Sequence, residues 1–177
     1  MRNEGLKFGQ DNDKVYGLLF DGAWLWEEYL NTILKECGFK HPLNKESKGA
    51  IYLFRDPKSY KRYPDFWREN FILDAKYKRL NENKVDRNDM HQIISYMFVK
   101  KAKLGGFVFP VEEYKSQENK EIGKLDGYGG TVKIWSLTIS DEKTNFKNFC
   151  NKMIENENEL KDIILKDKAL SDNILYK

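Results

Sequence analysis

The sequence predicts an α/β domain in which a mixed β-sheet is flanked by helices. Apolar side chains recur at helical spacing over residues 21–37 and again over residues 88–103. Short apolar or alternating segments, of which residues 71–77 and 131–139 are the clearest, separate or follow these helices and are typical of strands. Helices and strands that interleave in this way indicate a sheet sandwiched by helices.

The first predicted helix spans residues 21–37, with Asp21 as its N-cap and Gly38 as its C-terminal stop. The second spans residues 88–103 and is expected to end at Gly105-Gly106. A third is expected from Glu142 to about Leu165. Strands are predicted at residues 50–54, 63–66, 71–77, 107–109 (closed by Pro110) and 131–139. A polar stretch rich in Lys, Glu and Gly, residues 112–130, precedes the last of these strands.

Length and composition indicate one domain. The chain has 177 residues, of which 40% are hydrophobic, and we expect a single unit over residues 1–177, with a core at about 15–140 and a helical segment at 141–177. The two cysteines show no metal-binding spacing and are interpreted as reduced and structural. The sequence has neither a signal peptide nor an apolar run near the roughly 20 residues of a membrane span. We therefore expect no membrane partner and a cytoplasmic location.

The most informative motif is Pro64-Asp65 followed by Asp74-Ala75-Lys76. Side chains two apart in a strand share a face, so Asp74 and Lys76 are expected to point the same way. Asp65, delivered from a neighbouring strand or turn, would complete a cluster of two carboxylates and one ammonium. We expect this cluster on a metal-facing strand surface and not in the core.

These residue types suit the hydrolysis of phosphodiester bonds. Mg²⁺, with Mn²⁺ as a possible substitute, prefers hard oxygen ligands, which the carboxylates of Asp65 and Asp74 and the carbonyl of Ala75 would supply. Such a cation neutralises phosphate charge and makes water a better nucleophile. Lys76 would stabilise developing negative charge or position the attacking water.

Three blocks of sequence together resemble the PD-(D/E)xK nuclease superfamily, and within it the endonuclease domain of McrC-type and LlaJI-type restriction subunits. The blocks are Phe20-Asp21-Gly22-Ala23-Trp24-Leu25-Trp26-Glu27-Glu28-Tyr29-Leu30, Asp74-Ala75-Lys76-Tyr77-Lys78 and His91-Gln92-Ile93-Ile94-Ser95-Tyr96. The resemblance covers roughly residues 15–140 and implies a restriction-endonuclease-like core.

The resemblance also implies residue roles. Asp65 and Asp74 match the metal-binding acids, and Lys76 matches the catalytic lysine. Glu27 matches the acid of the first helix, expected at the metal site, and Gln92 matches the glutamine beside the scissile phosphate. Tyr96 follows Gln92 one turn later on the same face.

The activity implied by the resemblance is Mg²⁺-dependent cleavage of double-stranded DNA in a complex with a GTP-hydrolysing AAA+ partner. Two coordinated strand cuts would require dimerisation or another way of pairing two nuclease domains. McrC-type subunits carry an additional N-terminal docking region, whereas this chain begins almost directly at the nuclease helix. It is therefore interpreted either as an excised domain or as a shorter protein that docks differently.

Charge distribution supports a polyanionic substrate. Residues 55–79 contain eight Lys or Arg and four acids, a net charge of +4. Basic side chains around an acidic metal pocket favour DNA, although a solvated charged face is the alternative. The predicted DNA contacts are Arg68, Lys78, Arg79 and Tyr96. Two other functions stay open: a non-catalytic scaffold that binds DNA or an AAA+ partner, and another enzyme with the same site, such as a junction resolvase or repair exonuclease.

Overall fold

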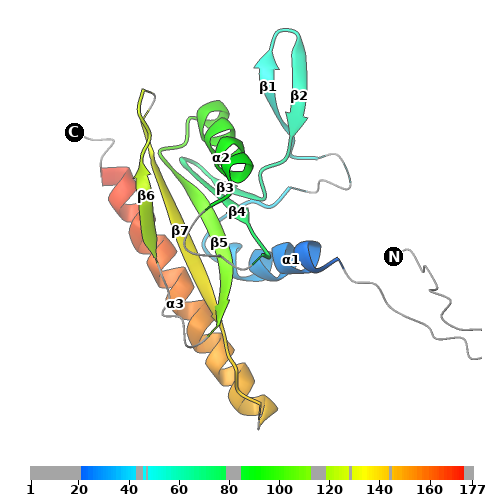
Figure 1. Cartoon of the computed structure of the whole chain (residues 1–177), viewed down its shortest axis with the longest axis vertical. Helices are drawn as coiled ribbons and strands as arrows, with labels where there is room; N and C mark the ends of the chain where they lie inside the picture. Colours follow the sequence, from blue (N-terminus) through cyan, green and yellow to red (C-terminus); the bar gives the residue numbers. More distant parts are fainter. Residues whose placement is uncertain are drawn as a thin grey trace, which may run out of the picture.

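The computed structural model describes residues 21–42, 46, 48–78, 85–112, 119–127, 129–143 and 145–173. Within these residues it has the predicted α/β architecture, a mixed sheet flanked by helices (Figure 1). The elements in chain order are α1 (Gly22–Leu34), β1 (Ile51–Arg55), β2 (Lys58–Arg62), β3 (Phe66–Arg68), β4 (Phe71–Ala75), α2 (Arg87–Lys100), β5 (Leu104–Glu112), β6 (Lys120–Lys124), β7 (Thr131–Ile139) and α3 (Phe146–Asn173).

The central sheet has the strand order β3-β4-β5-β7-β6. Strands β4, β5 and β7 run parallel to one another, whereas β3 and β6 are antiparallel to their neighbours at the two edges. Strands β1 and β2 form a separate two-stranded hairpin. The parallel strands end on the same side of the sheet, which is where open α/β sheets place ligand sites.

Each face of the sheet packs against a different set of helices. Alternate residues of β4, β5 and β7, such as Leu73, Val108 and Trp135, pack on one face with buried side chains of α1 and α3. The residues between them, such as Ile72 and Phe107, pack on the other face with α2. This alternation follows from the two-residue period of a strand, and it directs Asp74 to the same face as Ile72.

The predicted start of the first helix is confirmed. Asp21 Oδ1 accepts hydrogen bonds from the backbone N–H groups of Ala23 and Trp24, both at 3.1 Å, which is the geometry of an N-cap. The helix ends at Leu34, and Gly38 takes a left-handed conformation with φ of 80° a few residues later. Within the predicted apolar stripe, Trp26, Leu30, Ile33, Leu34 and Cys37 are buried, whereas Ala23 is exposed.

The prediction that Gly105-Gly106 ends the second helix is wrong. Helix α2 ends at Lys100, and Lys101 terminates it with φ of 55°. Both glycines belong to β5, where a Cβ at Gly105 would lie 2.4 Å from Met97 Sδ and one at Gly106 would lie 1.8 Å from the carbonyl oxygen of Lys133. The glycines therefore allow close packing of β5 against α2 and β7.

Several other boundaries differ from the predictions. Strand β5 continues through Pro110 to Glu112, and α3 continues to Asn173. The strand expected at 63–66 is β3 instead, at Phe66–Arg68. Strands β2 and β6 were not predicted, because their charged sequences lack an apolar alternation. Among the described residues no helix is long and apolar enough to span a membrane.

Candidate active site

Asp74 and Lys76 form a close ion pair at the carboxyl end of β4. Asp74 Oδ2 lies 2.6 Å from Lys76 Nζ, so the prediction that the two side chains point the same way is confirmed. The expected location was wrong for Asp74, because its side chain is buried, with the residue only 1% exposed. Asp74 belongs to the face of the sheet that α2 covers, where it pairs in register with Phe107 of β5.

Asp65 reaches this pair from the residue just before β3. Strand β3 runs antiparallel to β4 with Phe66 opposite Leu73, so Asp65 lies beside Asp74. Its Oδ2 accepts a hydrogen bond of 2.8 Å from the backbone N–H of Ala75. The N–H and C=O of one strand residue point to the same edge, and the Ala75 carbonyl is therefore directed toward the Asp65 side.

The surroundings of both carboxyl groups disfavour their ionised forms. Burial raises the pKa of Asp65 well above its usual value, and the neighbouring Asp74 and Glu27 carboxylates raise it further. Burial also raises the pKa of Asp74, and Lys76 offsets only part of that increase. A cation that binds between the two carboxylates stabilises an acid pair of this kind.

Lys76 is held by two acids. Its Nζ lies 3.0 Å from Asp89 Oδ1 in addition to its contact with Asp74. Burial by itself would lower the pKa of Lys76, but Asp74 and Asp89 raise it to about 12. Lys76 is therefore a cation at neutral pH and is not available as a general base.

Sequence analysis did not identify Asp89. It lies in the first turn of α2, where an acid is an ordinary partner of the helix dipole. Burial would raise the pKa of Asp89, but hydrogen bonds from Lys78 and Lys76 hold it below the usual range. The role of Asp89 depends on how α2 crosses the end of β4, which the spacing of the residues does not reveal.

Gln92 and Tyr96 extend the site along α2. Gln92 Nε2 donates a 2.8 Å hydrogen bond to Tyr96 Oη, and that hydroxyl lies 3.5 Å from the carbonyl oxygen of Tyr63. Burial raises the pKa of Tyr96, and Asp74 and Asp65 contribute to the increase. The Tyr96 hydroxyl is thus directed toward the acid pair, although the residue itself is only 2% exposed.

Glu27 approaches the pair from α1. Burial raises the pKa of its half-buried carboxyl group, and Asp74 adds to this effect while His41 opposes it. His41, which sequence analysis missed, also places its Nδ1 2.8 Å from the carbonyl oxygen of Asp65 and stacks on Phe66. The histidine thereby fixes the backbone that presents Asp65.

The arrangement fits a divalent cation held by oxygen ligands. Among the described residues, buried Asp74 Oδ2 has no correctly aligned hydrogen-bond donor, although Lys76 Nζ is close to it. A buried polar atom in this condition is costly unless a ligand completes its shell. No three His, Cys, Asp or Glu side chains within the described ranges converge closely enough to form a ready-made metal cluster. Asp65, Asp74 and the backbone of Ala75 are the oxygen-bearing groups that lie side by side at the end of β4.

The comparisons with known proteins agree with this geometry. A model of the family described as "McrBC 5-methylcytosine restriction system component" matches residues 1–110, which is more than half of the chain. The chain belongs to this McrBC family. No curated protein matches the sequence.

A solved structure has a fold similar to that of this chain. A solved half-complex from the tetradecameric assembly of Thermococcus gammatolerans McrB AAA+ hexamers with bound McrC contains a similar chain, with a TM-score of 0.50 and 14% sequence identity. The match covers 79% of this chain and 34% of that chain. The McrBC-family chain thus spans about a third of the length of its structural neighbour, and at this identity the likeness supports the fold alone.

The matched part of the McrBC-family chain contains every member of the acid and lysine cluster. The predicted DNA contacts around it are less uniform. Lys78 is exposed and pairs with Asp89 Oδ2, whereas Arg68 donates from its guanidinium to the carbonyl of Cys37, away from the acids. Arg79 lies outside the described residues. Of the four, the structure brings Lys78 and Tyr96 close to the cluster.

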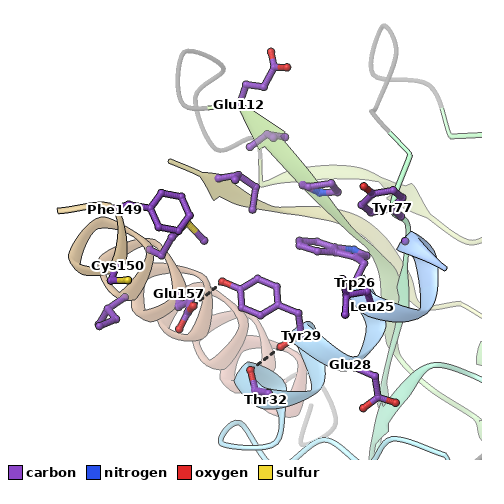
Figure 2. A pocket seen from close by; sticks show the side chains of 16 residues that line it. Leu25, Trp26, Glu28, Tyr29, Thr32, Tyr77, Glu112, Phe149, Cys150 and Glu157 are labelled. Atoms are coloured by element: carbon purple, nitrogen blue, oxygen red, sulfur yellow. Dashed lines mark hydrogen bonds between the residues drawn. The ribbon is translucent and has the colours of Figure 1, made fainter. Parts of the chain in front are cut away.

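A separate groove lies between α1, α3 and the ends of β5 and β7 (Figure 2). It has a volume of about 1260 Å³ and is mostly apolar, with Trp26, Tyr29 and Met153 among its lining residues. Tyr29 Oη donates a 2.6 Å hydrogen bond to Glu157 Oε1 across it. Neither Asp65, Asp74 nor Lys76 lines this groove, so it is distinct from the acid cluster.

Proposed function

We propose that this chain is a divalent-cation-dependent endodeoxyribonuclease and the DNA-cleaving component of a McrBC-type restriction system. The observation that carries the proposal is the group formed by Asp65, Asp74 and Lys76 at the end of β4. There the half-buried carboxyl of Asp65 lies beside the buried carboxyl of Asp74, and burial raises the pKa of both. A scaffold protein would gain no stability from that arrangement.

In this proposal Asp65, Asp74 and the Ala75 carbonyl hold Mg²⁺, for which Mn²⁺ can substitute. When bound, the ion neutralises phosphate charge and raises the acidity of water. The hydrogen bond from the Ala75 N–H fixes one oxygen of Asp65, which leaves the other available. Glu27 adds negative charge at the edge of the site and helps to attract the ion.

Lys76 interacts with the phosphate as a permanent cation. Its pKa of about 12 means that it stabilises the extra negative charge that develops on the phosphate oxygens during attack. Asp74 and Asp89 hold its ammonium from two sides, which reduces the entropy lost when substrate binds. Gln92 and Tyr96 support the same wall of the site through their mutual hydrogen bond.

The proposed substrate is double-stranded DNA, and the proposed partner is a GTP-hydrolysing AAA+ subunit. Membership of the McrBC restriction family and the fold shared with a chain of the McrB–McrC assembly support both. A double-strand break needs two such sites, so we propose that two copies of this domain act together on the duplex.

The test is cleavage of supercoiled plasmid by the purified chain with Mg²⁺, with Mn²⁺ and with EDTA, and the same series after addition of its AAA+ partner and GTP. We expect nicked or linear product only with a divalent cation, from the wild type and from Asp167→Asn but not from Asp74→Asn. Asp167→Asn serves as the matched control, because Asp167 also forms an ion pair with a lysine but lies on α3. Absence of cleavage with and without the partner, or equal cleavage by Asp74→Asn, would overturn the proposal.

A further inference from the structure

The β1–β2 hairpin is separate from the central sheet. Its strands pair only with each other in the described structure, from Ile51 opposite Arg62 to Arg55 opposite Lys58. Figure 1 shows it projecting from the body of the molecule beside α2. Ile51 anchors its base in the core cluster beneath α2, so the hairpin is fixed at one end and open to solvent at the other.

The hairpin carries a concentration of exposed positive charge. Its four basic residues are all exposed, and Asp56 in the turn is its only acid. These residues are Arg55, Lys58, Lys61 and Arg62. Lys58 Nζ lies 4.2 Å from the centre of the Tyr52 ring, and Lys61 Nζ lies 5.1 Å from that of Tyr63. These cation–π contacts hold the lysine side chains against the hairpin.

Two large aromatic side chains are exposed beside these cations. Phe54 is 54% exposed and Tyr60 is 61% exposed, and their ring centres are 5.4 Å apart in an edge-to-face contact. Tyr60 has φ of 56°, a left-handed conformation that bulky residues rarely adopt. Backbone strain of this kind tends to occur at functional positions, and here it accompanies an aromatic pair that the hairpin leaves open to solvent.

The base of the hairpin leads directly into the candidate active site. Arg62 ends β2 three residues before Asp65. The carbonyl oxygen of the intervening Tyr63 accepts a hydrogen bond from the Tyr96 hydroxyl. The charge of Arg62 acts to lower the pKa of Tyr96. A duplex whose phosphate lies at the acid and lysine cluster would therefore extend along the hairpin.

We propose that the β1–β2 hairpin binds double-stranded DNA next to the phosphate that is cut, with its tip in the major groove. This inference rests on the proposed function and adds the surface that grips the substrate. The major groove is wide enough for a two-stranded ribbon. In it the basic side chains contact phosphates on both sides, while Phe54 and Tyr60 pack against base edges and sugars.

The test is binding of a fluorescein-labelled 30-base-pair duplex by fluorescence anisotropy, in EDTA and over a series of salt concentrations. All proteins carry Asp74→Asn in the full 177-residue chain, so binding is measured without cleavage. One variant adds Arg55→Ala with Lys58→Ala, and another adds Phe54→Ala with Tyr60→Ala. The control adds Lys120→Ala with Lys124→Ala, two exposed cations on the edge strand β6.

For the basic double variant we expect at least about a tenfold loss of affinity at low salt and a slope of log K against log salt that is smaller by about two, one for each lost phosphate contact. The aromatic double variant should lose affinity with an unchanged slope, because it removes no charge. The control should keep both affinity and slope. Thermal unfolding of each variant establishes that it is folded.

Folded hairpin variants that bind the duplex as tightly as the control would overturn the inference. So would an aromatic variant that keeps its DNA affinity but loses self-association in sedimentation, which would indicate a protein contact. Binding that depends on the hairpin in a chain that never cleaves would instead refute the nuclease proposal and leave the hairpin inference standing. The two failures can therefore be distinguished.

Discussion

Two aspartate–lysine pairs within the described residues, Lys133–Asp167 and Lys76–Asp74, have similar contact distances but different surroundings. In the pair on α3 and β7, Asp167 Oδ1 lies 2.7 Å from Lys133 Nζ, and Oδ2 accepts a 2.9 Å hydrogen bond from Trp135 Nε1. Both oxygens of Asp167 thus have partners. In the pair at the end of β4, Lys76 is equally close to Asp74 Oδ2, but that oxygen has no aligned donor in the described structure.

The two pairs also differ in the charged groups that surround them. Asp65 lies beside Asp74, and the Asp74 carboxylate raises the pKa of both Asp65 and Glu27. An ion pair whose hydrogen bonds are complete stabilises the fold or is neutral. A pair with a second acid beside it stores unfavourable free energy, which a bound cation would relieve. The second acid, and not the presence of a buried charge, distinguishes the candidate site.

The largest expected effect is on the cleavage rate, which substitution of Lys76 should lower far more than substitution of Lys133. Lys76→Met removes the cation from the site and should slow cleavage roughly 100-fold or more, the range seen when one stabilising donor is lost. Lys133→Met should leave the rate within a few-fold of wild type. Single-turnover cleavage with Mg²⁺, and with the AAA+ partner if it is required, measures both. Similar losses in the two variants would show that the comparison has no functional meaning.

A smaller effect of opposite sign is expected in stability. Asp167→Asn puts an amide where two donors converge and should lower the free energy of unfolding by about 1–3 kcal/mol. Asp65→Asn can still accept the Ala75 hydrogen bond while removing a repelling charge, so in EDTA at neutral pH it should unfold at a higher temperature than wild type. Urea and thermal unfolding give the two signs. A loss of stability in Asp65→Asn would contradict the account.

The pH dependence sharpens the same point. Below about pH 3.8, the usual pKa of an aspartate, the carboxyl is protonated in both states and has no effect. As the pH rises, the unfolded chain ionises first, because the folded-state pKa of Asp65 is raised. The wild type should therefore lose stability relative to Asp65→Asn by up to about 1.4 kcal/mol per pH unit. The loss levels off above the folded-state pKa.

Denaturant unfolding in EDTA at a series of pH values from 4 to 8 measures this difference. The Asp167→Asn protein is again the control, because it keeps Asp65. Its stability should therefore fall relative to that of Asp65→Asn as the pH rises. A constant difference between the two variants would mean that Asp65 has no effect on the pH profile. Parallel profiles for wild type and Asp65→Asn would show that Asp65 is not buried against a second negative charge.

Much of the fold could be predicted from the sequence because its signals are local. The N-cap at Asp21, the apolar stripe of α1 and the alternation of β7 each depend on neighbouring residues. The strands with charged sequences, β2 and β6, could not be predicted in this way, since β2 is stabilised by pairing with β1 and β6 by pairing with β7. Gly105 and Gly106 were misassigned because their requirement is a close approach by Met97 and Lys133.

For the site, the spacing of Asp74 and Lys76 predicted their shared face, and a resemblance to known nucleases supplied Glu27 and Gln92. The burial of Asp74, the second acid on Lys76 and the support of Asp65 by His41 could not be predicted. Each depends on how segments distant in sequence meet: α2 lies over the end of β4, and His41 contacts Asp65 from 24 residues away. The basic hairpin likewise becomes recognisable only when β1 and β2 are seen to pair.

The measurement that tests the central claim most directly is Mn²⁺ binding by electron paramagnetic resonance in wild type, Asp74→Asn and Asp167→Asn. It depends on neither DNA nor a partner. The account predicts that wild type and Asp167→Asn bind Mn²⁺ with the same affinity and that Asp74→Asn loses this site. Equal binding by all three proteins, or loss of binding in Asp167→Asn alone, would contradict the assignment of Asp65 and Asp74 as the cation site.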